Sequence, residues 1–208
     1  MPDIMNPISY TSLSLDIIKS KKENKNFNYK DWGDESLTTL RTEIRNYYKK
    51  TQNGVCVYCQ NSISIISPLN CHVEHIAPKS LYEKFIFEPR NLCVVCADCN
   101  TIKREQEVHN ENEDVMTNKF TNYPRSSKAF KIYHPHFDIW AEHIICFNGI
   151  YADITDKGAN TIRICKLNRR LREFGVDERF INHPEVFHVA NQLLQNGKIE
   201  EIKKIINF

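Results

Sequence analysis

The sequence predicts an α+β protein, because segments with helical periodicity stand beside short apolar runs of strand length. From Leu37 to Tyr48, apolar residues recur at helical spacing, which indicates a helix with one buried face. In the second half, Asn148-Gly149 between two apolar runs indicates a β-hairpin. Strands are predicted at 71–76, 92–95, 144–147 and 150–154.

The composition is that of a globular protein: of the 208 residues, 41% are hydrophobic and 26% are charged. The longest apolar runs, such as 63–66 and 144–147, are far too short to cross a bilayer. The N-terminus lacks the basic start and apolar stretch of a signal peptide, so we expect a cytoplasmic protein without membrane contact. The formal net charge is only +2, so nucleic-acid binding would need a local basic surface.

Three regions follow from these patterns. Residues 1–33 are polar and rich in Lys and Asn, and we expect a partly helical arm there. Residues 34–110 form the predicted core, which starts with a helix that ends near Thr51 and that Asp34 or Ser36 can cap. The two strands of the core enclose a loop, and a helical stretch at 100–108 follows them. Residues 111–208 contain the hairpin and predicted helices at 159–174, 184–196 and 199–206.

Two Cys-x-x-Cys pairs at the two ends of the predicted strand–loop–strand segment indicate a metal site. Eight cysteines in a protein expected in the cytoplasm favour metal binding over disulfides. Zinc prefers four thiolate or imidazole ligands in a tetrahedron, and two such turns can supply them. The predicted ligands of one structural zinc are Cys56, Cys59, Cys96 and Cys99.

The cysteine pattern leaves alternatives open. Cys93 and Cys96 also form a Cys-x-x-Cys, although Cys93 lies inside an apolar strand, where a buried thiol is ordinary. The four residues could also be free cysteines with no metal. Cys71, Cys146 and Cys165 are expected to be core residues.

The residues between the two pairs resemble the HNH endonuclease family. Glu74-His75 followed by Pro78, Asn91-Leu92, and Cys99-Asn100 followed by Lys103 occur in the order that is typical of that family. The similarity covers about residues 56–103 and implies a ββα-metal fold. The chain departs from the letter pattern at the third position, which is Asn100 instead of histidine.

The resemblance also implies roles for these residues. His75 matches the general base that activates water, and Glu74 and Asn100 match the ligands of a catalytic divalent ion. Asn91 matches the middle asparagine of the motif, which braces the loop more than it takes part in chemistry. Carboxylate and amide oxygens favour Mg²⁺ or Mn²⁺, and a neutral histidine can accept a proton from water. Phosphodiester hydrolysis needs both functions.

Other segments are similar to HNH proteins of bacterial anti-phage systems, namely the Septu-type (PtuB-like) and retron-linked nucleases. Those proteins work with an SMC/ABC-like (PtuA-like) ATPase, so the resemblance implies such a partner. The similar segments are Gly54–Cys59, Val73–Lys79, Tyr133-His134-Pro135, Asn148-Gly149 and Thr161–Arg169.

The expected nucleic-acid contacts are basic residues near the motif and on a later helix. Lys103 could contact phosphate or be a solvated helix lysine, and the later basic face could equally be solvated or contact an acidic partner. His72, His134 and His136 are expected to have no metal or catalytic role. The candidate contacts are Lys79, Lys103, Arg163, Lys166 and Arg169.

DNA hydrolysis is therefore the expected activity, and two other functions stay open. An RNA-cleaving nuclease of the same type is not excluded by the sequence, because the motif engages phosphate and reads no base directly. A non-catalytic zinc-dependent module that binds nucleic acid or protein would need the cysteines but not Glu74, His75 or Asn100.

Overall fold

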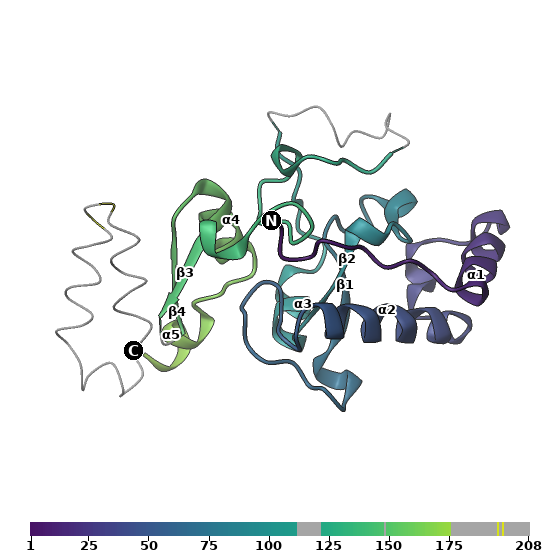
Figure 1. Cartoon of the computed structure of the whole chain (residues 1–208), viewed down its shortest axis with the longest axis horizontal. Coiled ribbons are helices and arrows are strands. Elements are labelled where there is room, and N and C mark those ends of the chain that lie inside the picture. The colour runs from purple at the N-terminus through teal and green to yellow at the C-terminus, as the bar shows by residue number, and fades with distance from the viewer. Residues whose placement is uncertain (112–121, 148, 176–194, 196, 198–208) are drawn as a thin grey trace.

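The computed structural model describes residues 1–111, 122–147, 149–175, 195 and 197, and within these residues the chain is a mixture of helices and strands, as predicted (Figure 1). Two separate two-stranded antiparallel sheets form, β1 with β2 and β3 with β4. The elements are α1 (Ser12–Glu23), α2 (Thr38–Thr51), β1 (His72–His75), β2 (Leu92–Val95), α3 (Ala97–Lys103), β3 (Ile144–Phe147), β4 (Ile150–Asp153), α4 (Asp156–Ile164) and α5 (Arg169–Phe174).

The β1–β2 sheet forms the centre of the molecule. In its register, Glu74 lies opposite Cys93 and His75 lies opposite Leu92. All four residues of β2 are buried, which explains the uninterrupted apolar run in the sequence. Cys96 caps α3 directly after β2, so strand, strand and helix follow one another as predicted.

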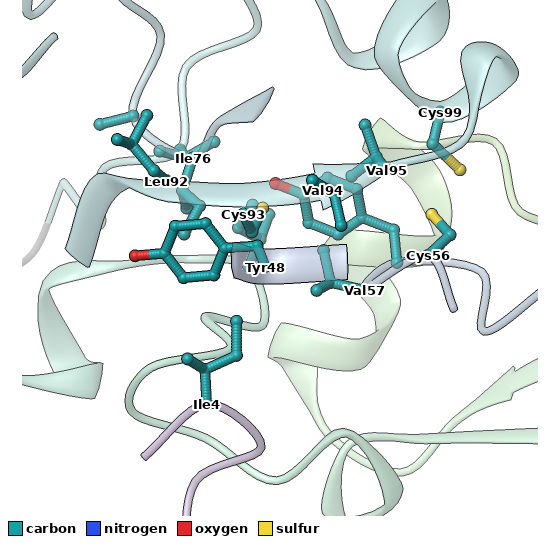
Figure 2. Packing of buried hydrophobic residues seen from close by; sticks show 14 of the residues in the cluster. Ile4, Tyr48, Cys56, Val57, Ile76, Leu92, Cys93, Val94, Val95 and Cys99 are labelled. Atoms are coloured by element: carbon teal, nitrogen blue, oxygen red, sulfur yellow. The ribbon is translucent and has the colours of Figure 1, made fainter. Parts of the chain in front are cut away.

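Helix α2 packs across this sheet with the apolar face that its spacing predicts. Leu40, Ile44 and Tyr48 are fully buried, and Figure 2 shows the ring of Tyr48 beside the residues of β2. The Tyr48 hydroxyl donates to the Pro89 carbonyl at 2.6 Å and accepts from the Ile8 amide at 3.2 Å. One side chain thus connects α2, the loop before β2 and the N-terminal segment.

The N-terminal segment is packed into the core, which differs from the polar arm that its composition suggested. Ile4 and Ile8 are buried, and Ile4 points toward the sheet in Figure 2. The Ile4 amide donates to the Pro135 carbonyl at 2.8 Å, and the Tyr133 hydroxyl donates to the Asp3 carboxylate at 2.5 Å. The apolar side chains here are few and lack periodicity, so their burial was not visible in the sequence.

The second sheet and the last described helices lie beside the core (Figure 1). The predicted hairpin is present, and Gly149 occupies its turn with φ of 82°. Helix α4 begins earlier than predicted because Thr155 caps it, and Gly158 is needed there because a Cβ would lie 1.9 Å from the His143 carbonyl oxygen.

Two predicted helices differ in extent from those of the structure. The expected helix 159–174 is divided into α4 and α5, since Lys166 takes a left-handed conformation with φ of 45°. The helix expected at 100–108 is α3, which ends at Lys103 because Arg104 has φ of 44°. The helices predicted at 184–196 and 199–206 lie outside the described residues, apart from the single positions 195 and 197. No helix in the described part of the chain has the length and apolar character needed to span a bilayer.

Candidate functional site

The four predicted cysteines form a compact cluster. Their sulfur atoms all lie within 4.8 Å of one another, and all four residues are buried. The Cys59 and Cys96 sulfurs are 3.7 Å apart. Four sulfurs placed tetrahedrally at about 2.3 Å from a zinc ion would lie about 3.8 Å apart. The cluster therefore fits one zinc ion, and the predicted group of four cysteines is confirmed.

The structure also distinguishes between the two possible cysteine registers. Cys93 lies in the middle of β2, opposite Glu74, and is not part of the cluster. Cys71 and Cys165 are buried elsewhere, and Cys146 is partly exposed. Within the described ranges, no second group of three or more His, Cys, Asp or Glu side chains is arranged to hold a metal ion.

Residues of the C-terminal part hold the cysteine cluster from outside. The Tyr151 hydroxyl donates to the Cys59 carbonyl at 2.6 Å, and the Trp140 indole donates to the Tyr58 carbonyl at 2.9 Å. The Arg169 guanidinium donates to Asp98 at 3.1 Å and lies 3.9 Å from the Cys99 sulfur. Arg169, which was expected to contact nucleic acid, lies against the cysteine cluster in the structure.

A polar cleft of about 740 Å³ brings together three of the motif residues, Glu74, His75 and Asn100. Its walls come from α2, from β1 and the loop after it, and from α3. The lining residues are Trp32, Gly33, Arg41, Arg45, His72, Val73, Glu74, His75, Pro78, Lys79, Ser80, Asn100, Arg104 and Glu105.

His75 is held in one orientation at the end of β1. Its Nε2 lies 3.0 Å from the Ile86 carbonyl oxygen, so Nε2 carries the hydrogen and Nδ1 keeps a free lone pair. Trp32 packs edge-on against the ring at 4.5 Å between centroids. Burial lowers the pKa of His75 to about 3, with Lys79 adding to the effect, so the imidazole is neutral at physiological pH.

Glu74 and Lys103 form a buried ion pair. Lys103 Nζ lies 2.6 Å from Glu74 Oε1 and also donates to the His75 carbonyl at 3.1 Å. Burial raises the pKa of the Glu74 carboxyl, and the charge of Lys103 opposes that rise. Lys103 is fully buried, so its predicted contact with phosphate is wrong: its ammonium is turned into the protein toward Glu74.

Asn91 lies behind the cleft and braces the loop after β1. Its Oδ1 accepts from the Ala77 amide at 2.7 Å, and its Nδ2 donates to the carbonyls of Ala77 and Phe85, each at 3.1 Å. Asn91 does not line the cleft, so its place in the structure is that of a brace, as the resemblance implies, with no contact to reacting groups.

Two buried histidines extend this brace toward the C-terminal part. The Tyr123 hydroxyl donates to Asn91 Oδ1 at 3.0 Å and lies 2.9 Å from His134 Nε2. His136 Nε2 lies 2.9 Å from the Leu92 carbonyl oxygen. His134 and His136 therefore serve the packing of the core. His72, by contrast, lines the cleft, with its Nε2 3.0 Å from the Leu69 carbonyl oxygen.

The cleft also contains arginines that the sequence patterns did not single out. Arg41 donates to the carbonyls of Trp32 and Asp34 and to the Thr38 hydroxyl, which connects α2 to the segment before it. Within the described ranges, Arg45 uses only Nε, which donates to the Cys71 carbonyl at 3.0 Å. The available signal was the spacing of Arg41 and Arg45, one helical turn apart on the polar face of α2.

The remaining predicted contacts lie in two places. Lys79 lines the cleft, with its ammonium 6.0 Å from the centre of the Tyr29 ring. Arg163 and Lys166 line a separate hollow of about 320 Å³ at α4 and α5. The structure therefore brings Lys79 to the motif residues but places Arg163 and Lys166 elsewhere.

No protein-family model matches the chain, and a search of curated proteins finds no match either. Function must therefore be inferred from the cleft and the cysteine cluster themselves.

The cleft also offers ligands for a hard cation. The Glu74 carboxylate and the half-buried Asn100 amide line the same space, and oxygen ligands of these two kinds suit Mg²⁺ or Mn²⁺. Lys103 faces Oε1, which leaves Oε2 as the oxygen through which Glu74 can bind an ion. Two oxygen donors of the kinds that these ions prefer therefore line the same cleft.

Proposed function

We propose that this chain is a metal-dependent HNH-type endonuclease that hydrolyses phosphodiester bonds in DNA. The observation that carries the proposal is the single cleft that holds Glu74, His75 and Asn100 beside several cationic side chains. A strand–strand–helix unit positions the three residues, and the cysteine cluster joins the two ends of that unit.

His75 is the proposed general base. The Ile86 carbonyl fixes Nε2 as the hydrogen-bond donor, so Nδ1 is the atom that can take a proton from water. In the free protein, burial and the nearby lysines lower the pKa of His75. An arriving phosphate is an anion, and its charge favours the imidazolium and raises that pKa. Substrate binding thus makes His75 a better base at the moment it is needed.

Glu74 and Asn100 are the proposed ligands of the catalytic Mg²⁺ or Mn²⁺ ion. The chemistry that such an ion supplies is stabilisation of negative charge on the phosphate and on the leaving oxygen. Lys103 holds the Glu74 carboxylate in place and favours its ionised form, because a buried carboxylate without a cation nearby would favour its protonated form. Lys103 is therefore a positioning residue in this proposal.

The test is cleavage of DNA by the wild-type protein and by His75→Ala, with Mg²⁺ or Mn²⁺ present. Loss of a general base lowers the rate by about 10²–10⁴-fold. Zinc content and thermal melting, measured on both proteins, separate a catalytic defect from misfolding. Equal cleavage by a folded His75→Ala variant would reject the assignment of His75.

The choice of DNA over RNA can be tested with the same pair of proteins. Duplex DNA, single-stranded DNA and structured RNA are offered at equal nucleotide concentration. We expect DNA to be cut fastest, and a clear preference for RNA would keep the nuclease but change its substrate. Absence of cleavage with every substrate and metal, alone or with a partner, would favour a non-catalytic zinc-dependent binding module.

We also propose that the nuclease is the effector of a bacterial anti-phage complex with an SMC/ABC-like ATPase. The support is the similarity of its flanking segments to Septu-type and retron-linked HNH proteins. The test is to co-express the chain with the ATPase encoded beside it and to look for a stable complex by size-exclusion chromatography. Lack of an ATPase gene nearby, or lack of co-purification, would contradict this placement.

A further inference from the structure

We infer that Arg45 and Arg104 form a two-point binding site for the phosphate backbone of a polynucleotide, on either flank of the phosphodiester that is cut. This inference rests on the proposed function and adds to it the part of the substrate that the cleft holds. Both arginines line the cleft of Glu74 and His75, and neither belongs to the motif that suggested the activity.

Lys79 lines the cleft with only a ring contact to Tyr29 and was already expected to contact nucleic acid. Three other cations in or near the cleft are engaged within the protein. The Lys103 ammonium pairs with Glu74, and the Arg41 guanidinium makes three hydrogen bonds within the chain, from both of its terminal nitrogens. The Arg169 guanidinium lies at the cysteine cluster. A donor that is already engaged within the protein cannot hydrogen-bond a phosphate without breaking that contact.

Arg45 has N–H donors that make no hydrogen bond within the described residues. A hydrogen bond from Nε to the Cys71 carbonyl fixes the direction of the guanidinium. Among the residues that the structure describes, both terminal nitrogens, Nη1 and Nη2, have no hydrogen-bond partner, and together they match the paired oxygens of a phosphate. Because the side chain is held in advance, less conformational entropy is lost when a phosphate binds.

Arg104 offers a second point from a different element. It follows the last residue of α3 with φ of 44°, a conformation that turns the chain away from the helix axis. The side chain is exposed and makes no hydrogen bond or ion pair within the described residues. Helices α2 and α3 both contact β1, so Arg45 and Arg104 reach the same cleft from two elements that pack against the strand carrying His75.

The size and lining of the cleft indicate an extended ligand read through its backbone. A volume of about 740 Å³ lies within the range of about 300–1,000 Å³ that holds ligands much larger than one phosphate. The lining contains one aromatic residue, Trp32, and that ring is buried against His75, so it cannot stack on a base. Contacts to phosphate position a nucleic acid without specifying its sequence. The cleft should therefore accept many sequences.

Two substrates test this inference against a purely catalytic or structural role. Arg45→Gln and Arg104→Gln are compared with wild type on a polynucleotide and on bis(p-nitrophenyl) phosphate, which has one phosphodiester and no flanking phosphates. We expect each variant to raise KM for the polynucleotide by about tenfold, since a hydrogen bond to a charged group has about that worth. Hydrolysis of the small diester should stay within about twofold of wild type.

Binding provides the second readout. In a His75→Ala background, each variant should weaken polynucleotide binding and reduce the slope of log K against log salt concentration by about 0.7–0.9. The matched control is Lys50→Gln, which removes a charge from an exposed position of α2 outside the cleft and should change neither quantity.

The outcomes separate the inference from the proposed function. If the Arg45 and Arg104 variants bind polynucleotide like wild type, or if the small diester suffers as much as the polynucleotide, the inference is wrong. If wild type hydrolyses neither substrate, the proposed activity fails, and the binding measurements alone then decide the inference. Reduced binding with an unchanged Lys50→Gln control would still support it.

Discussion

Lys103 Nζ lies 2.6 Å from Glu74 Oε1, in a pair that the protein surrounds almost completely. The lysine reaches back from the last turn of α3 and also donates to the carbonyl of His75. A charged pair taken out of water is held in place by the cost of separating it. This pair therefore fixes the position of α3, and with it Asn100, relative to β1.

Removal of the cation alone should destabilise the protein strongly. Lys103→Met leaves the Glu74 carboxylate buried without a partner, and we expect a loss of about 3–5 kcal/mol in the free energy of unfolding. Without Lys103 the pKa of Glu74 rises further, so the buried carboxyl takes up a proton more readily. The defect should therefore be largest at neutral pH and should shrink as pH falls toward 5. Urea denaturation at several pH values measures both effects, and the double variant Glu74→Gln/Lys103→Met should recover part of the loss.

Stability should decrease in mild acid because buried histidines must be kept neutral. Burial lowers the pKa of His75 to about 3 and that of His136 to about 4, and it lowers the pKa of His134 well below its usual value. Above the unfolded-state pKa of about 6.5, both states are neutral and the stability is complete. Below that pKa only the unfolded state takes up protons. Each buried histidine then lowers the free energy of unfolding by about 1.4 kcal/mol for every pH unit.

Urea denaturation between pH 7 and pH 5 measures that slope. His136→Gln should reduce the slope of the unfolding free energy against pH by the contribution of one histidine. The glutamine still places an amide near the Leu92 carbonyl. A stability that is independent of pH over this interval would contradict the buried, neutral state of these side chains.

The cysteine cluster predicts zinc content and its dependence on individual residues. Purified protein should contain about one zinc per chain, as a closed four-ligand site requires. Cys56→Ser should lose the metal together with stability, because zinc binding contributes folding free energy. Cys93→Ala is the matched control from the neighbouring strand and should keep its zinc. Loss of zinc from Cys93→Ala alone would contradict the ligand set seen in the structure.

Arg169 should strengthen zinc binding without being a ligand. Its guanidinium lies 3.9 Å from the Cys99 sulfur and 4.0 Å from the Cys96 sulfur, where its charge offsets that of the thiolates. Loss of such an outer partner costs about 10–100-fold in metal affinity. We expect Arg169→Gln to lose zinc to a chelator correspondingly more readily. Arg172→Gln, on the same short helix, should behave like wild type. Equal zinc affinities for all three proteins would show that Arg169 does not contribute to zinc binding.

The parts of the molecule with strong local patterns could be predicted from the sequence. Helix α2 followed from its apolar spacing, the hairpin from Asn148-Gly149, and the four-cysteine cluster from its two paired turns. The helix and the hairpin are specified by residues within a few positions of each other, and each cysteine pair is a local turn, although the cluster joins residues 37 apart. The composition of the candidate cleft was predicted in part, since three motif residues do line it.

The predictions that were wrong concern residues whose position depends on contacts with distant parts of the chain. Nothing in the spacing of α3 indicates that Lys103 faces a carboxylate on β1, because that contact joins residues 29 apart in the chain. The same holds for Arg169, whose partners lie near residue 98. The end of α3 was also missed, since the left-handed conformation of Arg104 occurs at a residue type that rarely adopts it.

The contacts of Asp3 and Ile4 with Tyr133 and Pro135 have a consequence for the order in which the protein is made. These first residues leave the ribosome long before their partners are synthesised, and an N-terminal segment with such distant contacts cannot complete its packing early. Contacts of high sequence separation also slow folding, because a long loop must close before they form. The contacts of Ile4 with Pro135, and of Asp3 with Tyr133, therefore form only after residues beyond 135 have emerged, so this part of the core closes late.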